Sequence, residues 1–351
     1  SSDLAKTLAN ILSTVGAAAA AATSNQEPVE GDSLLFGTRY RSIYWDGELE
    51  ARRINLGDGS TSVSSEWSAA TKLDNKVSAS ADARTIWLQS DSNASTLKRF
   101  VWSELSATEQ NYLGRLCDDP QKLSQCANLT SAEKTAVTGE RLLNYLRGQS
   151  AFEDRLENSS RFFRQREHVL GAPVNAQPVY VGRPAFRYAD DNYGEFRDGL
   201  MANRKGIVYM AANDGMLHAF DAASGDEQWA FIPAGVLPGM YRYADARFSQ
   251  NFSFLLDGSP VVGDVCPLAL GYSAPRCTAE AWRTILVGGL GAAGREFYAI
   301  DITDPANPKA LWRFGIAQDS DVGYALGKPL ITKRRDGRWI VVLASGYNNT
   351  N

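Results

Sequence analysis

Short alternating runs of apolar residues, separated by turn residues, recur along most of the chain. The clearest lies at 206–232, which reads GIVYMAANDGMLHAFDAASGDEQWAFI. Its apolar positions have the period of two that is typical of strands. Asn213-Asp214-Gly215 and Ser224-Gly225-Asp226 supply residues that accept the positive φ of tight hairpin turns. The pattern predicts three antiparallel strands, with Trp229 in the third, and is typical of one blade of a β-propeller.

Partial copies of this unit indicate several blades. Residues 46–51 (DGELEA) match 214–219 (DGMLHA), and 297–301 (FYAID) match 217–221 (LHAFD). The copies are unevenly spaced and too few for a complete ring. The sequence therefore predicts an all-β fold, a partial and modified quinoprotein-like propeller with blades of four-stranded antiparallel sheet. The residues expected to build the blades are Asp214, Gly215, Leu217, Ala219, Asp221, Trp229, Tyr298, Asp301 and Trp312.

Two segments depart from the strand pattern. Apolar residues at helical spacing predict an N-terminal helix from Ser2 to Ala22, so that 1–32 form a helix and linker ahead of a propeller at 33–351. From 106 to 157 the pattern is helical again, with a capping box at 130–133. We interpret this stretch as an insertion on the propeller scaffold.

Further strands are predicted outside these two segments. Asp46-Gly47 is predicted to turn, and short strands are predicted at 34–45, 85–87, 100–102, 179–181 and 284–287.

Composition excludes several classes of protein. The net charge is −4, and the densest basic run is Lys333-Arg334-Arg335, so nothing suggests a nucleic-acid partner. No segment has the roughly 18 apolar residues that cross a bilayer, so no transmembrane segment is predicted. The first residues lack the pattern of a signal peptide. We interpret the chain as a fragment of a longer protein, with a trimmed mature chain as the alternative.

The four cysteines fall into two local pairs in loop-like contexts. Cys117 and Cys126 form one, and Cys266 and Cys277 the other. Metal sites built from four cysteines usually contain Cys-x-x-Cys pairs, and the sequence has none. We predict two disulfides that close loops, which indicates an oxidising compartment. The alternative is four unrelated reduced thiols.

Motifs that carry chemistry are weak. Residues 289–294 match GxGxxG, but a strand follows where a dinucleotide site needs a helix, so a hairpin loop is predicted. The acidic stretch 190–195 lacks the Gly and Glu positions of a calcium loop and is interpreted as a solvated turn.

Single titratable residues also give no sign of a site. His218 is expected to be a packed residue rather than a metal ligand. Asp257, Asp264 and Asp301 are expected to bond turn amides. The residues predict no catalytic, cofactor or metal site, and so no enzyme.

Several stretches taken together resemble one family, the C-terminal propeller of the PilY (PilC) type IV pilus biogenesis and tip adhesin proteins. They are 44–49 (YWDGEL), 143–148 (LNYLRG), 164–171 (RQREHVLG), 175–182 (NAQPVYVG), 212–221 (ANDGMLHAFD), 288–291 (GGLG), 298–301 (YAID) and 346–348 (GYN). The combination is specific, whereas each stretch alone is not.

The resemblance implies an exported, non-enzymatic protein at the pilus tip or outer membrane. It would promote pilus assembly by opposing retraction, and support surface attachment and twitching motility. The implied partners are major or minor pilins and a host or abiotic surface. The family carries a von Willebrand A-like domain upstream and a calcium-binding loop after the region matching 346–348, so calcium is expected downstream and no ligand is transferred to this chain. Arg147-Gly148-Gln149 stands where relatives often have Arg-Gly-Asp, so integrin-type binding is not predicted.

Two other functions share the blade pattern. One is a dehydrogenase dependent on pyrroloquinoline quinone, which should hold the quinone, calcium and a catalytic Asp in the channel of about eight regular blades. The other is an assembly scaffold of the outer-membrane propeller type. We expect the present chain to bind through a surface, with the insertion at 106–157 and the loop 266–277 as contact sites.

Overall fold

Strands dominate the computed structural model, which describes residues 17–23, 34–55, 58, 60–118, 120–267 and 277–349. The described strands form four sheets. The first contains β1 (Ala17–Thr23), β2 (Leu34–Arg41), β3 (Asp46–Arg53) and β4 (Trp67–Ser68). The second runs β6 (Leu97–Arg99), β5 (Ile86–Gln89), β10 (Glu227–Ile232), β9 (Met216–Asp221), β8 (Ile207–Ala212) and β7 (Val179–Val181). The third contains β11 (Val261–Val265), β12 (Arg283–Gly289), β13 (Glu296–Asp301) and β14 (Lys309–Gly315), and the fourth β15 (Leu330–Lys333) and β16 (Trp339–Val342).

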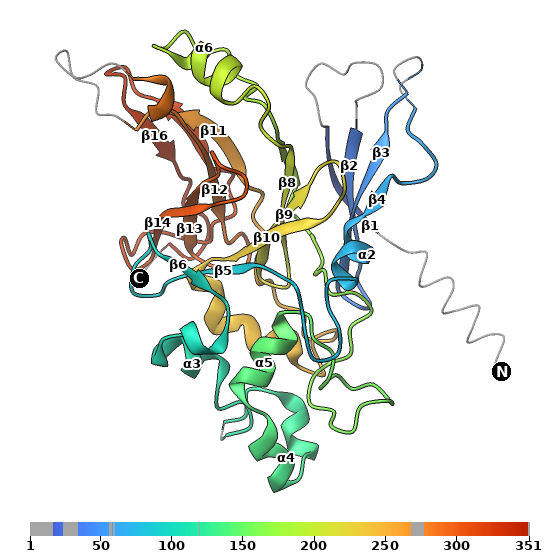
Figure 1. Ribbon diagram of the computed structural model, residues 1–351. Helices are drawn as coiled ribbons and strands as arrows, with labels where there is room; N and C mark the ends of the chain where they lie inside the picture. The colour runs from blue at the N-terminus through green and yellow to red at the C-terminus, as the bar shows by residue number, and fades with distance from the viewer. Residues whose placement is uncertain are drawn as a thin grey trace.

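The sheets are arranged as consecutive propeller blades. Strands β1, β7, β11 and β15 each lie at one edge of a sheet, and contacts run from β1 to β7, from β7 to β11 and from β11 to β15. Figure 1 shows the blue first sheet and the orange and red third sheet on opposite sides of the second. No ring is closed among the described strands. The predicted all-β, partial propeller is confirmed.

The hairpins of the second sheet form where the sequence predicts them. β8 pairs with β9 from Ile207↔Asp221 to Ala212↔Met216, around a turn in which Gly215 has φ 91°. The next turn uses Gly225, with φ 75°. Every residue of β8 and β9 is buried, because neighbouring sheets cover both faces. The glycine-rich stretch 289–294 likewise joins two antiparallel strands, β12 and β13, and opens no helix.

Three local predictions are wrong. The six alanines predicted to be helical lie in β1, which pairs with β2 from Ala17↔Tyr40 to Thr23↔Leu35. Alanine favours helices by less than about 1 kcal/mol per residue, and sheet pairing overrides so weak a preference. The rest of the predicted helix, before Ala17, lies outside the described residues.

The strand predicted at 100–102 is displaced to β6, which a hairpin aligns with β5. Phe100 is fully buried in the core instead, and a 3₁₀ helix, η1 (Trp102–Glu104), follows. Asp46-Gly47 begins β3 rather than turning, and the turn falls one residue earlier, where Trp45 has φ 54°. In both places the apolar pattern located strands approximately but not the residues at which they begin and end.

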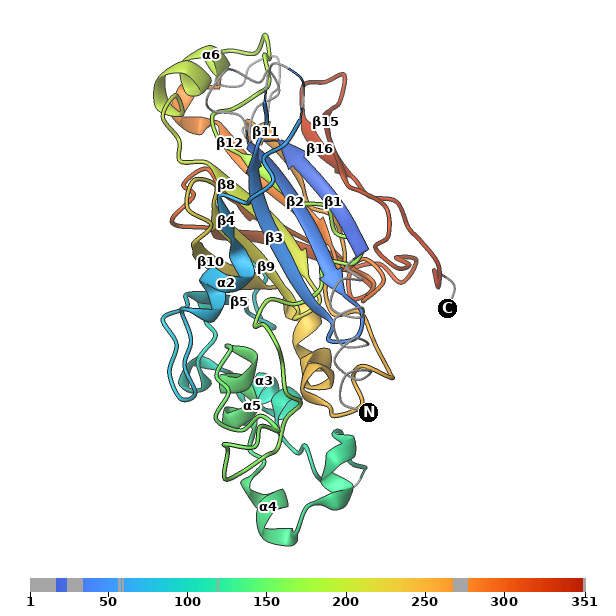
Figure 2. The ribbon, with the colours of Figure 1, turned by 90° about the vertical axis from the view of Figure 1, so that its right-hand side faces the viewer.

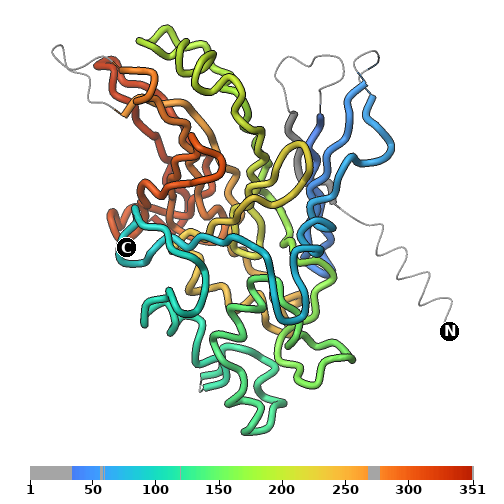
Figure 3. Tube along the Cα trace, in the orientation of Figure 1, coloured from blue at the N-terminus to red at the C-terminus, as the bar shows by residue number. Residues whose placement is uncertain are grey.

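The stretch predicted as a helical insertion contains short helices. They are α3 (Ala107–Leu113), η2 (Ser124–Asn128), α4 (Ser131–Ala136) and α5 (Gly139–Leu146). Thr130 and Glu133 form the predicted capping box at the start of α4. The other helices among the described residues are α2 (Ala69–Asp74), α6 (Tyr193–Glu195), the π-helical turn η3 (Phe196–Leu200), η4 (Ala234–Ala244) and η5 (Ala279–Ala281). Figures 2 and 3 show the green insertion at the opposite end of the molecule from the segment around α6.

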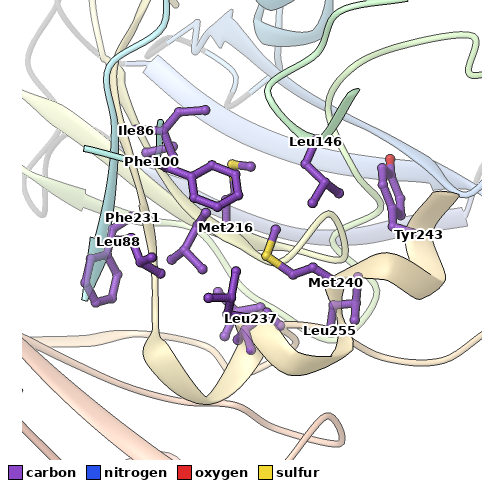
Figure 4. Packing of buried hydrophobic residues seen from close by; sticks show 14 of the residues in the cluster. Ile86, Leu88, Phe100, Leu146, Met216, Phe231, Leu237, Met240, Tyr243 and Leu255 are labelled. Carbon is purple, nitrogen blue, oxygen red and sulfur yellow. The ribbon is translucent and has the colours of Figure 1, made fainter. Parts of the chain in front are cut away.

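The insertion shares its core with the second sheet. Leu146 of α5 lies in the same buried cluster as Met216 and Phe231 of the sheet and Met240 of η4 (Figure 4). Helices α3 and α5 both contact η4. The insertion is therefore packed onto the blade scaffold rather than around a core of its own.

Candidate functional site

The aspartates of the blade motifs hold backbone amides. Asp221 Oδ1 accepts hydrogen bonds from the amides of Ala223 at 2.8 Å and Ser224 at 3.0 Å. Asp301 Oδ1 accepts from the amide of Thr303 at 2.9 Å. Such bonds fix the turn that follows each strand.

Asp257 and Asp264 have different partners from those expected. Asp257 accepts from Asn175, whose amide N and Nδ2 lie 2.9 and 2.6 Å from its carboxylate oxygens. Asp264 accepts from the hydroxyl groups of Tyr193 at 2.7 Å and Thr284 at 2.6 Å. Each carboxylate therefore joins separate segments of chain rather than closing its own turn.

The remaining blade residues belong to the core or its borders. Leu217, Ala219 and Tyr298 are fully buried, and Trp312 is partly buried against the third sheet. Trp229 is buried, and its Nε1 donates to the carbonyl oxygen of Pro305 in the third sheet's β13–β14 turn at 2.8 Å. The indole thus connects two blades.

Both cysteine pairs are disulfides. Cys117 is bonded to Cys126 in the insertion, with Cα atoms 5.3 Å apart. Cys266 is bonded to Cys277, with Cα atoms 6.3 Å apart, and closes the loop that leaves β11. The second pair packs in an aromatic cluster with Tyr193, Phe196 and Trp282.

The acidic stretch 190–195 borders this aromatic cluster. Asn192 Nδ2 donates to the Cys277 carbonyl oxygen at 2.7 Å, and Asp190 forms an ion pair with Lys333.

A buried cluster of charges lies inside the second sheet. His218, fully buried as expected of a packed histidine, places Nδ1 2.8 Å from Glu227 Oε1 and Nε2 3.1 Å from Asp214 Oδ2. Arg84 forms two hydrogen bonds of 2.8 Å with the same glutamate. Asp214 also accepts from the amide of Gly171 at 3.0 Å, which ties the cluster to the neighbouring segment.

The charges in this cluster stabilise one another. Burial alone would lower the pKa of His218, but Asp214 and Glu227 raise it to about 9. Burial alone would raise the pKa of Glu227, but Arg84 and His218 hold it far below its usual range. Both shifts favour the ionised forms at neutral pH. All four side chains are almost completely buried, so the cluster supports the fold.

This arrangement predicts a loss of stability at alkaline pH. A histidine with a raised pKa stabilises the fold fully below its ordinary value of about 6.5, and that contribution disappears as pH rises through about 9. We expect the unfolding midpoint in urea to fall between about pH 6.5 and 9. In a His218→Leu variant the fall should be smaller. Equal pH profiles for the two proteins would contradict the assignment. His168, whose pKa Asp74 also raises, contributes equally to both profiles.

A cleft of about 260 Å³ lies where three equivalent loops meet, one before each of β7, β11 and β15. The loops are 175–177, 257–259 and 326–328, and each precedes a proline. Lys328 Nζ bonds to Gln177 Oε1, and burial raises the pKa of Asp257. The polar groups of the cleft thus already bond one another. Among the described residues, no group of three or more His, Cys, Asp or Glu side chains could hold a metal ion.

Comparison with known proteins identifies the family. A sequence model of the PilY1 beta-propeller domain matches residues 170–351, more than half of the chain. The chain belongs to the PilY1 β-propeller family. The family resemblance predicted from the motifs is thereby confirmed.

The PilY1 relatives extend the match over nearly the whole chain. The Type IV pilus biogenesis factor PilY1 of Pseudomonas aeruginosa strain PAO1 is 33% identical over 344 residues, which cover 95% of this chain and 27% of the relative. A PilY1 homolog of Xylella fastidiosa strain Temecula1 is 31% identical over 97% of this chain and 24% of the relative. The chain therefore spans about a quarter of these relatives' length.

A solved structure also matches part of the chain. The crystal structure of the P. aeruginosa PilY1 C-terminal domain is 36% identical over 48% of this chain and 31% of that chain, with a TM-score of 0.37. Among the described residues of the present chain, no helix has both the length and the apolar character needed to cross a membrane.

Proposed function

We propose that this PilY1-family propeller belongs to a type IV pilus biogenesis factor that acts at the pilus tip. In this proposal the protein is exported, promotes pilus assembly by opposing retraction, and supports surface attachment and twitching motility. Its partners are pilins and the surface to which the cell attaches. The observation that carries the proposal is the match to relatives named type IV pilus biogenesis factors over 95% of the chain.

Two features of the structure support a role in binding rather than catalysis. The buried carboxylates Asp221 and Glu227 bond partners within the protein, a backbone amide and a guanidinium group respectively. The helices of the insertion at 106–157 lie at the opposite end of the molecule from α6, whose Tyr193 packs with the Cys266–Cys277 pair. We propose that the insertion and the loop 266–277 contact the partners and that the chain has no enzymatic role. Calcium, where the parent protein binds it, would bind outside these residues.

Deletion of the parent gene tests the role in assembly. Surface pili are sheared from the cells and counted in strains with and without the retraction motor. We expect pili to disappear when the motor is present and to return when it is absent, because an assembly factor that opposes retraction is dispensable without retraction. Unchanged piliation in both strains would contradict the proposal. Purified full-length protein would then be tested for binding of pyrroloquinoline quinone.

Removal of the loop between Cys266 and Cys277 tests the contact site. We expect a variant in which both cysteines and the residues between them are replaced by a short Gly-Ser linker to reduce pilus number or attachment. The same replacement of the loop closed by Cys117 and Cys126 tests the insertion, which is the second proposed contact site. The proposed contact would be refuted if the first variant were present at normal amounts with unchanged pilus number and attachment.

A further inference from the structure

The turn between β2 and β3 presents aromatic side chains in a strained conformation. Trp45 has φ 54°, a left-handed value that bulky residues rarely adopt, at a cost of about 1–3 kcal/mol. The two residues before it, Ile43 and Tyr44, are 42% and 39% exposed. Something must hold so unfavourable a turn in place.

Ring stacking holds the indole of Trp45. Its ring lies 3.5 Å from that of Phe252, with the planes 13° apart, and is nearly parallel to the ring of Tyr40 at 6.2 Å. Phe252 in turn meets Phe248 and Phe254 edge to face. Stacked pairs contribute about 0.5–1.5 kcal/mol each, enough together to offset the backbone strain.

Two arginines hold the backbone and the neighbouring tyrosine. Arg164 is mostly buried against the rings of Tyr243 and Phe248, and its Nη1 donates to the carbonyl oxygen of Tyr44 at 2.8 Å. Arg41 forms an ion pair with Asp46 and lies over the Tyr44 ring, 4.9 Å from its centroid. The rings are therefore fixed before any ligand arrives, which lowers the entropic cost of binding.

Polar side chains border these rings on the surface. Ser42 precedes the exposed pair in the turn, and Gln250 and Asn251 precede Phe252 in the adjoining loop; all three are exposed. The indole Nε1 of Trp45 reaches the same loop, 3.5 Å from the carbonyl oxygen of Ser249. We call this surface the Trp45 patch, made of Tyr40, Ser42, Tyr44, Trp45, Gln250, Asn251 and Phe252.

We propose that the Trp45 patch binds a saccharide. A pyranose ring has an apolar C–H face that packs on an aromatic ring and hydroxyl groups around its edge that bond amides and hydroxyls. The exposed ring of Tyr44 offers the first, on the face away from Arg41, and the stacked indole of Trp45 supports the turn that carries it. Ser42, Gln250 and Asn251 offer the second. A wholly apolar partner would leave Gln250 and Asn251 unsatisfied, at a cost for each buried polar group. The charge of Arg41 is balanced by Asp46, so the patch does not require an anionic ligand.

The proposal adds a ligand class to the attachment role and depends on that role for its biological meaning. Its test does not depend on pili. The purified chain is applied to a printed array of neutral and acidic oligosaccharides, and the strongest spots are repeated with variants. Trp45→Asn removes the indole but keeps a residue that accepts positive φ, and Tyr44→Ala removes an exposed ring with little effect on the core. Phe186→Ala is the control, because Phe186 is also 39% exposed and stacked on a tyrosine.

We expect the wild type and Phe186→Ala to bind the same spots, and both patch variants to lose at least about tenfold in signal, as loss of a stacked ring implies. Thermal unfolding identifies any variant that fails to fold. If Trp45→Asn fails to fold, the binding of Tyr44→Ala alone tests the proposal. The proposal would be overturned if the wild-type protein bound no spot on the array. It would also be overturned if both patch variants folded and still bound, or if Phe186→Ala lost as much binding as the patch variants. Pilus counts in the gene deletion stay informative in each case.

Discussion

Replacing Glu227 with glutamine is expected to destabilise the protein by about 3–5 kcal/mol. The side chain keeps its size, but Arg84 and His218 lose the carboxylate that lies 2.8 Å from each of them. Both cations would remain in a region where Arg84 and Glu227 each have about 1% of their side chains exposed. An uncompensated buried charge is costly because no water replaces its partner. Urea unfolding at neutral pH, followed by tryptophan fluorescence, measures the change.

Glu66→Gln is the matched control for this variant. Glu66 also pairs with an arginine, Arg53, at 2.8 Å, but the two side chains are 36% and 58% exposed. Exposed pairs contribute about 0–1 kcal/mol, so the midpoint should barely move. Equal effects of the two substitutions would show that the buried cluster does not stabilise the second sheet.

Replacing Trp229 with alanine should destabilise the protein by a similar amount, about 3–5 kcal/mol. The indole is 1% exposed, packs against Tyr209 with ring centroids 5.7 Å apart, and donates to Pro305 across two blades. Its loss leaves a cavity in the second sheet and removes a hydrogen bond to the third. Urea unfolding again measures the effect.

Two further variants separate the causes. Trp229→Phe retains most of the ring and removes the hydrogen bond, so a loss of about 1–2 kcal/mol is expected from the bond and the smaller volume. Leu156→Ala, at a side chain that is 90% exposed, should change stability by no more than about 0.5 kcal/mol. If Trp229→Ala were as harmless as Leu156→Ala, the indole would not be the connection between blades that the structure indicates.

Local signals in the sequence were enough to predict the blades. Period-two alternation and the glycines at 215 and 225 located β8, β9 and β10, because strand faces and positive φ restrict the residues directly. The capping box at Thr130 was equally local. What the sequence could not supply was pairing between distant segments. β5 joins β10 in parallel across about 140 intervening residues, and no local pattern encodes such a partner.

The buried charge cluster and the Trp45 patch were harder to predict for the same reason. Arg84 and Glu227 are 143 positions apart, and Trp45 of the β2–β3 turn stacks on Phe252 of the segment between η4 and β11. Neither the ion pair nor the ring stack therefore has a sequence signature. A glycine is expected where φ is positive, yet Trp45 adopts that conformation because stacking compensates for the strain. The alanine run was included in the helix predicted from the spacing of the apolar residues before it, but it pairs with β2 instead.

The most direct test of the account is a count of sheared pili in a strain whose parent gene lacks only the propeller segment, residues 34–349. The count is made with and without the retraction motor, after immunoblotting shows that the shortened protein is present. We predict that pili are lost with the motor and restored without it, as in the full deletion. Normal piliation with the motor present would contradict the claim that this domain promotes pilus assembly by opposing retraction.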